Sequence, residues 1–407
     1  MMAEMKEKVS RWRNPALGLA ALTLLADLAL ATPATRYGAT FILLWLLPGL
    51  AWTRLLTGRQ RRPTAEGITV GLGIGMGTVA VLTLLLHFLP GPLTLPTLLI
   101  AVNLLTFALI LIPPRHSVSK RGSESRDFSS AVVHLSLVVF AAAFFRLTDL
   151  AYSEFQGDEG VVMVRAARAV LGDDAQLFYH QKGPVEVLLP TATWTLSGTI
   201  NEWQARLPFS FAGILGIVAL YLLGRRWFDE RIALVAALLL AINGYFVGFG
   251  RIVQYQSFVL AMTALALLAL WCWSEGKSRR WLAAGAALLA FGILAHYDAA
   301  LTLPAAAYVV TRRLWAARSQ WRALVVDVVW AGMLAFSILA LFYVPFALHP
   351  NFAKTLSYLG GARIGTGGPL YNNLHSSLPL AAFYNSTYYL VALACLIVWA
   401  SFLPFRH

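Results

Sequence analysis

The sequence predicts an all-α polytopic membrane protein with about twelve transmembrane helices. Hydrophobic residues fill 58% of the 407 positions, the mean hydropathy is +0.67, and only 13% of the residues are charged. One soluble core could not bury so much apolar surface. Apolar runs approaching the ~20 residues that cross a bilayer recur along the whole chain.

Short basic clusters separate these runs and predict the topology. Lys and Arg favour the cytoplasmic side, and most of the 32 fall there if the N-terminus is cytoplasmic. Membrane topology therefore explains the net charge of +13 better than nucleic-acid binding does. The same alternation places five charged residues together on the non-cytoplasmic side: Asp158, Glu159, Lys182, Arg251 and Asp298.

Prolines, glycines and basic turns delimit the individual spans. In order, the expected spans are 15–32, 40–52, 67–89, 95–112, 131–150, 206–225, 232–249, 258–273, 281–295, 299–310, 323–345 and 380–403. The segment at residues 115–130 is rich in Ser, Lys and Arg, and it predicts a linker that divides the chain into two parts. Residues 1–130 form an N-terminal four-helix membrane extension with a cytoplasmic linker, and residues 131–407 form a second membrane module whose sequence can be incomplete at its C-terminus.

The first apolar run lacks a convincing cleavage site, so we expect it to be retained as a helix. Cys272 and Cys395 both fall inside expected spans, which indicates neither a disulfide framework nor a thiolate metal site.

An acidic stretch, Phe155 to Gly160, follows the span 131–150 and contains the adjacent carboxylates Asp158 and Glu159 between glycines. We interpret it as a catalytic loop. The apolar segments 160–171 and 185–196 are too short to span, so we expect two short helices lying in the interface, the second broken by Pro190. They would form a platform where a lipid-linked substrate could enter from the side.

The order of these polar motifs resembles the GT-C membrane glycosyltransferases, above all families 39 and 83, typified by protein mannosyltransferases and the aminoarabinose transferase of lipid A. The motifs are Asp158-Glu159, then Tyr179-His180-Gln181-Lys182-Gly183-Pro184, then Glu202 and Arg206-Leu207-Pro208. The resemblance covers about residues 131–346. It implies inverting transfer of a sugar, hexosyl or pentosyl, from a polyprenyl-phosphate carrier to a lipid, glycan or protein acceptor on the outer face of the cytoplasmic membrane.

The resemblance also implies residue roles. Asp158 matches the family's general base, Lys182 the lysine that contacts the donor phosphate, and Arg251 a basic residue facing the same cavity. Gly183 departs from the family, which usually has the first of two prolines there. Further donor-side candidates are Tyr179, His180, Arg206, Gln254 and Gln256, and acceptor-side candidates are Asp298, Tyr371 and Asn372.

The chemistry of the reaction agrees with these roles. A base that takes the acceptor proton contributes ~10²–10⁴ in rate, and positive charge stabilises the departing phosphate. Glu159 is a weaker candidate for catalysis, because adjacent residues on a helix point about 100° apart.

Each candidate also has a structural interpretation. Asp158 could cap a helix, Lys182 and Arg206 could be snorkelling residues, and Arg251, Gln254 and Gln256 could form a solvated turn. His180 and His296 with Asp298 could hold a divalent metal, although ordinary polar residues are favoured and no cofactor is firmly indicated.

Two other functions stay open: a transporter or flippase of lipid-linked sugars, and a non-catalytic membrane subunit of envelope glycan assembly. Transporters usually place ionisable groups near the bilayer midplane and often contain two related halves. Here the charges collect at one face and no internal repeat is evident, which favours chemistry at the membrane surface.

Overall fold

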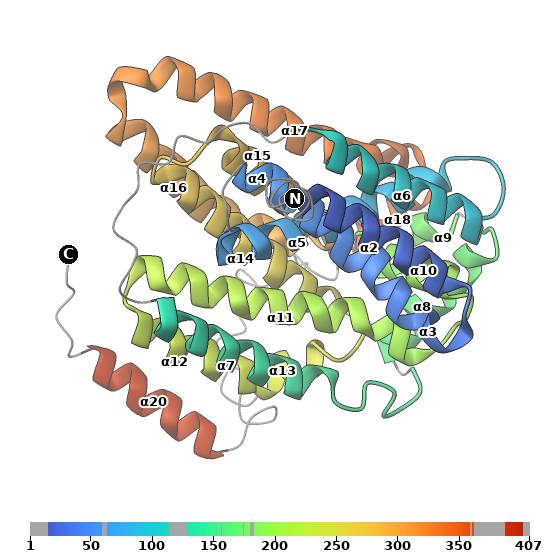
Figure 1. The fold of residues 1–407 in the computed structure, drawn as a ribbon, viewed down its shortest axis with the longest axis horizontal. Helices are drawn as coiled ribbons and strands as arrows, with labels where there is room; N and C mark the ends of the chain where they lie inside the picture. The colour runs from blue at the N-terminus through green and yellow to red at the C-terminus, as the bar shows by residue number, and fades with distance from the viewer. Residues whose placement is uncertain are drawn as a thin grey trace, which may run out of the picture.

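A computed structural model of the chain describes residues 15–58, 63–113, 128–155, 157–173, 175–179, 183–358, 360–361 and 387–401. These residues form helices and turns, with no strand among them (Figure 1). The predicted all-α class is therefore confirmed.

The N-terminal part comprises α2 (Pro15–Leu30), α3 (Pro33–Phe41), a π-helical segment (Ile42–Leu46), α4 (Leu47–Thr57), α5 (Ala65–His87), α6 (Leu95–Leu111) and α7 (Phe128–Leu147). The middle part comprises α8 (Gly157–Val170), α9 (Gln176–Tyr179), α10 (Val185–Ser197), α11 (Glu202–Trp227), α12 (Glu230–Ile242), α13 (Gly244–Phe249) and α14 (Tyr255–Ser274). The C-terminal part comprises α15 (Arg279–Ala295), a 3₁₀ turn (Tyr297–Thr302), α16 (Leu303–Ala316), a second 3₁₀ turn (Arg318–Gln320), α17 (Trp321–Leu348), α18 (Asn351–Tyr358) and α20 (Thr387–Ser401).

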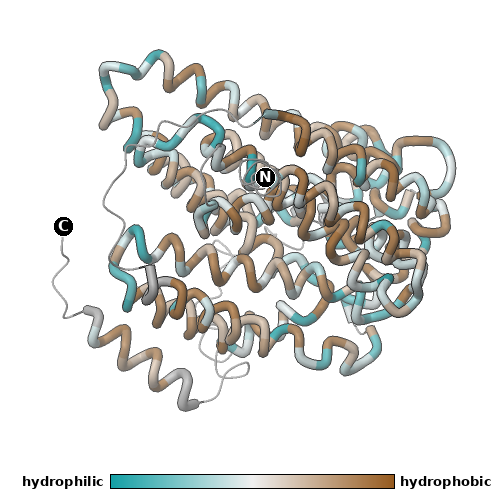
Figure 2. Tube along the Cα trace, in the orientation of Figure 1, coloured by the Kyte–Doolittle hydropathy of each residue, from teal (hydrophilic) through white to brown (hydrophobic). Residues whose placement is uncertain are grey.

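Hydrophilic residues gather at the two ends of the bundle and apolar residues fill its middle (Figure 2). Five helical stretches are long and apolar enough to cross a membrane: Pro33–Thr57, Ala65–His87, Glu202–Trp227, Tyr255–Ser274 and Arg318–Leu348. Shorter apolar helices accompany them. The structure thus shows a multi-pass helical bundle, while the number of twelve spans stays a prediction.

Helix α5 lies in the middle of the packing because glycines line two of its faces. A Cβ atom on Gly75 would lie 2.5 Å from the backbone nitrogen of Gly49 in α4, so the two helices pack backbone against backbone. On another face, a Cβ atom on Gly77 would lie 2.0 Å from the Phe291 ring in α15. Such close contacts leave no room for a larger side chain.

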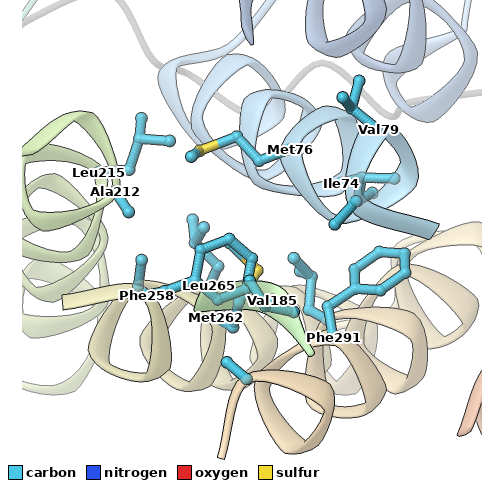
Figure 3. Close-up of a cluster of buried hydrophobic side chains, with 14 of the residues drawn as sticks. Ile74, Met76, Val79, Val185, Ala212, Leu215, Phe258, Met262, Leu265 and Phe291 are labelled. Atoms are coloured by element: carbon cyan, nitrogen blue, oxygen red, sulfur yellow. The ribbon is translucent and has the colours of Figure 1, made fainter. Parts of the chain in front are cut away.

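Side chains from both sides of the 115–130 linker share one hydrophobic core. Figure 3 shows part of it, contributed by α5 (Ile74, Met76, Val79), α10 (Val185), α11 (Ala212, Leu215), α14 (Phe258, Met262, Leu265) and α15 (Phe291). The N-terminal helices are therefore packed into the same bundle as the residues that carry the family resemblance.

The expected span 232–249 is wrong as a single helix, because the chain breaks between α12 and α13 at Asn243. The Asn243 side chain accepts a hydrogen bond from the Phe246 backbone N–H (3.2 Å) and so caps α13. Arg146, only 1% exposed, donates from Nη1 to the carbonyl oxygen of Ala241 (2.9 Å) at the end of α12. A cation at a helix C-terminus is favourable, and here it stabilises the break.

Helix α10 also differs from expectation. Every residue from Val185 to Ser197 is buried inside the bundle, and the helix continues through Pro190. The expectation of a broken surface helix at 185–196 is therefore wrong. A helix is present at the first of the two expected positions, as α8 with one face buried, and its place in the membrane interface stays a prediction.

Candidate functional site

A cavity of about 660 Å³ opens at one end of the bundle, where the loop after α7, the start of α8 and the turn before α14 meet. It is lined by Tyr152, Ser153, Glu154, Asp158, Glu159, Phe249, Ile252, Gln254, Tyr255 and Gln256. Four of the predicted site residues, two acids and two amides, therefore line one cavity.

Asp158 lies in the first turn of α8, after Gly157 in the left-handed conformation (φ +55°). Its side chain is exposed at the cavity wall. The positive end of the helix dipole favours a carboxylate at this position. Asp158 is thus placed where a ligand in the cavity can meet its carboxylate.

Glu159 has different surroundings from its neighbour. It is 4% exposed and binds the Arg206 guanidinium through both carboxylate oxygens, at 2.9 Å to Nε and 2.8 Å to Nη2. The expectation that adjacent carboxylates on a helix point in different directions is confirmed. Only one of the two is exposed at the cavity wall.

The Arg206 guanidinium is fully buried, so snorkelling does not describe it. Besides the two bonds to Glu159, it donates to the carbonyl oxygens of Leu150 (2.8 Å), Ser153 (2.9 Å) and Glu154 (3.4 Å). All five N–H donors of the guanidinium are therefore engaged. Arg206 ties the loop after α7 to α8 and α11, and no N–H is left for a donor phosphate.

Two buried carboxylates hold the turn before α14. Glu159 accepts the Val253 backbone N–H (2.9 Å), and Glu186 of α10, 0% exposed, accepts the Tyr255 backbone N–H (2.6 Å). The Gln254 side chain gives no cap to α14, so Glu186 takes that role from another helix. The sequence analysis did not single out Glu186. A carboxylate in the first turn of an otherwise apolar helix could have indicated a buried polar contact there.

Arg165 of α8 lies near the same carboxylate. Burial lowers the pKa of the Arg165 guanidinium, and the charge of Glu186 acts in the opposite direction.

Gln254 is 5% exposed and Gln256 is half-buried, so the interpretation of a merely solvated turn is wrong for these amides. The Gln256 Oε1 atom is buried and accepts no hydrogen bond within the described structure. Gln256 itself lines the cavity, so this acceptor without a described partner lies close behind the cavity wall.

Arg251 is fixed beside the cavity and does not line it. Its guanidinium donates to the carbonyl oxygens of Phe145 (3.3 Å) and Asp149 (2.9 Å) and lies 5.1 Å from the centre of the Tyr152 ring. Tyr152 itself lines the cavity.

The remaining described candidates lie further away. Asp298 Oδ2 is 3.1 Å from His296 Nδ1, and the His296 ring stacks on Tyr255 at 3.8 Å between ring centres, so Asp298 is linked to the cavity wall through two side chains. Tyr179 is 46% exposed and meets His349 edge-on, outside the cavity lining.

Lys182, His180, Tyr371 and Asn372 lie outside the described residues. Their predicted roles stay predictions. Within the described ranges, no group of three or more His, Cys, Asp or Glu side chains is placed to hold a metal ion.

The structure explains why glycine stands at position 183. The Gly183 N–H donates to the Ala295 carbonyl oxygen (3.3 Å), and a Cβ atom would lie 1.7 Å from the Leu294 carbonyl oxygen. Proline has no N–H and carries a Cβ atom, so it fits neither condition. The departure from the family pattern thus follows from a close backbone contact with the end of α15.

Comparison with known proteins finds a family likeness over part of the chain. Residues 181–346 match the model of the dolichyl-phosphate-mannose-protein mannosyltransferase family. The predicted resemblance to GT-C membrane glycosyltransferases is confirmed. This GT-C match covers less than half of the chain and begins after Asp158. No curated protein and no solved structure matches the chain.

Proposed function

We propose that this chain transfers a sugar from a polyprenyl-phosphate carrier to an acceptor at the outer face of the cytoplasmic membrane, with Asp158 as the general base. The family match supports a glycosyltransferase that uses a lipid-linked donor. The observation that carries the proposal for the site is the exposed Asp158 carboxylate on the wall of the 660 Å³ cavity. The cavity is of the size that small ligands occupy, ~300–1,000 Å³.

The reaction moves one sugar and one proton. The acceptor hydroxyl or amine attacks the anomeric carbon, the bond from that carbon to the phosphate oxygen breaks, and Asp158 takes the acceptor proton. The polyprenyl phosphate leaves as an anion. Attack opposite the leaving phosphate inverts the anomeric centre.

Aromatic and amide side chains of the cavity supply contacts suited to a sugar. The rings of Tyr152, Phe249 and Tyr255 can cover its apolar face, and the amides of Gln254 and Gln256 can exchange hydrogen bonds with its hydroxyls. Of these two amides, Gln256 is the one we assign to a sugar hydroxyl, because it is the less buried of the two and its Oε1 has no described partner.

Positive charge for the leaving phosphate is assigned to Lys182 and Arg251. Arg251 uses one hydrogen bond to each of two carbonyls, which leaves further N–H groups of its fork for an anion. Arg206 and Glu159 take a positioning role, because their partners are one another and the backbone.

The test uses the purified full chain in detergent, polyprenyl-phosphate sugars and total membrane extract, with products identified by mass spectrometry. Asp158→Asn should lower the transfer rate by about 10²–10⁴ and leave folding unchanged. Asp149→Asn is the matched control: Asp149 is exposed nearby, and its φ of +49° suits Asn.

Wild-type turnover in Asp158→Asn would remove Asp158 from the mechanism. Movement of a lipid-linked sugar across vesicles without any glycosylated product would favour the flippase instead.

A further inference from the structure

A second cavity lies at the opposite end of the bundle from Asp158. It has a volume of about 340 Å³ and lies between the end of α11, the last turns of α14 and one face of α16. Leu267, Ala305 and Val309 form its apolar part, and Trp227, Trp271 and Tyr308 its aromatic part. We call it the α14–α16 groove.

Cations close the polar end of this groove. Ala305, Tyr308, Val309 and Arg312 share one face of α16, because they recur at three- and four-residue spacing. The Arg312 guanidinium lies 4.4 Å from the centre of the Trp271 ring, and Arg312 Nη1 donates to Ser274 Oγ (3.1 Å). Arg312 therefore lies one turn beyond the apolar lining.

Arg226, which lines the groove, carries an unfilled donor. Its Nη1 and Nη2 atoms bind Glu275 and Glu66, but its buried Nε–H has no acceptor in the described structure. A buried N–H without an acceptor is costly. This donor belongs to a residue that lines the groove.

The surroundings indicate the kind of molecule that brings this anion. Trp227 and Tyr308 are 42% and 65% exposed, and three further cation–indole pairs lie at this end: Lys277 with Trp281, Arg318 with Trp315, and Arg322 with Trp321. Exposed aromatic and basic residues at the end of apolar spans lie at headgroup depth. The groove is too small for a whole lipid, and the apolar side chains of Leu301, just before α16, and Leu303, at its start, are also exposed.

We propose that the α14–α16 groove binds an anionic phospholipid, with the headgroup phosphate beside the guanidinium groups of Arg312 and Arg226 and the upper part of an acyl chain on Leu267 and Val309. The site is separate from the cavity at Asp158. It does not depend on the proposed transfer reaction.

The experiment measures binding of phosphatidylglycerol to the delipidated full chain by native mass spectrometry, with phosphatidylcholine and inorganic phosphate in parallel arms. We expect one tightly held phosphatidylglycerol, weaker binding of phosphatidylcholine, and no displacement of the lipid by phosphate alone. Arg312→Gln should weaken the binding about fivefold, and Arg312→Lys should restore most of it.

Two more variants distinguish lipid binding in the groove from general attraction between an anionic lipid and the basic end of the bundle. Ala305→Trp fills the groove from an exposed position and should also weaken binding, whereas Arg231→Gln removes an exposed cation at the same end and should not. Equal binding of the two lipids, equal loss in Arg231→Gln, no loss in Ala305→Trp, or displacement of the lipid by phosphate alone would each overturn the proposal.

Discussion

At the scale of single residues, Asp158 and Glu159 show how position on a helix gives two adjacent carboxylates different surroundings. Asp158 is exposed at the cavity wall, whereas Glu159 is buried and fills its acceptors with Arg206 and the Val253 N–H. An ion pair removed from water is held in place by such additional hydrogen bonds. We therefore expect Glu159 to matter for stability and Asp158 for chemistry.

Glu159→Ala should lower the free energy of unfolding by about 3–5 kcal/mol, because it leaves the Arg206 charge buried without its partner. Asp158→Ala, at an exposed position in the first turn of α8, should lower it by at most about 1 kcal/mol, the contribution of a carboxylate at a helix N-terminus. Denaturant unfolding of both variants in detergent provides the comparison. Equal stability of the two variants would contradict the roles given to these carboxylates.

Gly183 offers a second test at this scale. Gly183→Ala should destabilise the protein by about 1–3 kcal/mol, because its Cβ atom would meet the Leu294 carbonyl oxygen at 1.7 Å. Gly160→Ala is the control, since its nearest contact of 3.5 Å leaves room and Ala favours a helix by up to ~1 kcal/mol. In thermal unfolding, Gly183→Ala should lower the melting temperature and Gly160→Ala should raise it. A Gly183→Ala protein as stable as the wild type would disprove the close contact.

At the scale of elements, the N-terminus of α14 depends on other helices for its caps. Glu186 from α10 and Glu159 from α8 accept the N–H groups of Tyr255 and Val253, and the residues between and beside them line the cavity. The shape of this cavity wall is therefore set by the packing of three helices.

Glu186→Ala should lower kcat/KM about tenfold. The variant leaves the Tyr255 N–H without its acceptor, which costs about 1–3 kcal/mol. The cavity wall formed by Gln254 and Gln256 should therefore move. Glu186→Gln keeps a carbonyl oxygen in place and should retain most of the activity. Glu202→Ala, in the first turn of α11, is the control. If Glu186→Ala changes stability while KM and kcat stay constant, the carboxylate does not position the cavity wall.

At the scale of the whole molecule, the bundle has two polar ends with different contents. One end holds the cavity with Asp158, and the other holds the Arg226 ion pairs with Glu66 and Glu275 and the cation–indole pairs. The apolar middle between them is visible in Figure 2. This arrangement agrees with the basic side lying in the cytoplasm.

Cysteine labelling tests that orientation. In a chain in which Cys272 and Cys395 are replaced, Ile200→Cys at the cavity end should react with a membrane-impermeant maleimide in intact cells. Ser319→Cys at the other end should react only after lysis. Both positions are exposed. The reverse pattern would place the Asp158 cavity in the cytosol and exclude the proposed topology.

Much of the fold and of the candidate site was predictable from local sequence. Long apolar runs and basic turns determined a helical membrane protein with its charges at the ends, because hydrocarbon admits helices whose backbone is internally bonded. The acid pair after α7 and the amides before α14 indicated the site. Interruptions of helices were predicted less well. Pro190 was expected to break a helix but lies inside α10, and Asn243 interrupts a helix that was expected to be continuous.

Only the tertiary structure decided which polar groups meet. The pairing of Glu159 with Arg206, the cap that Glu186 gives to α14, and the contact of Gly183 with α15 all join segments far apart in the chain. No local pattern encodes such partners, since each depends on which helix faces pack together. Hydrophobicity thus determined a helical membrane bundle, and packing decided that Asp158 is exposed at the cavity wall while Glu159 is buried against Arg206.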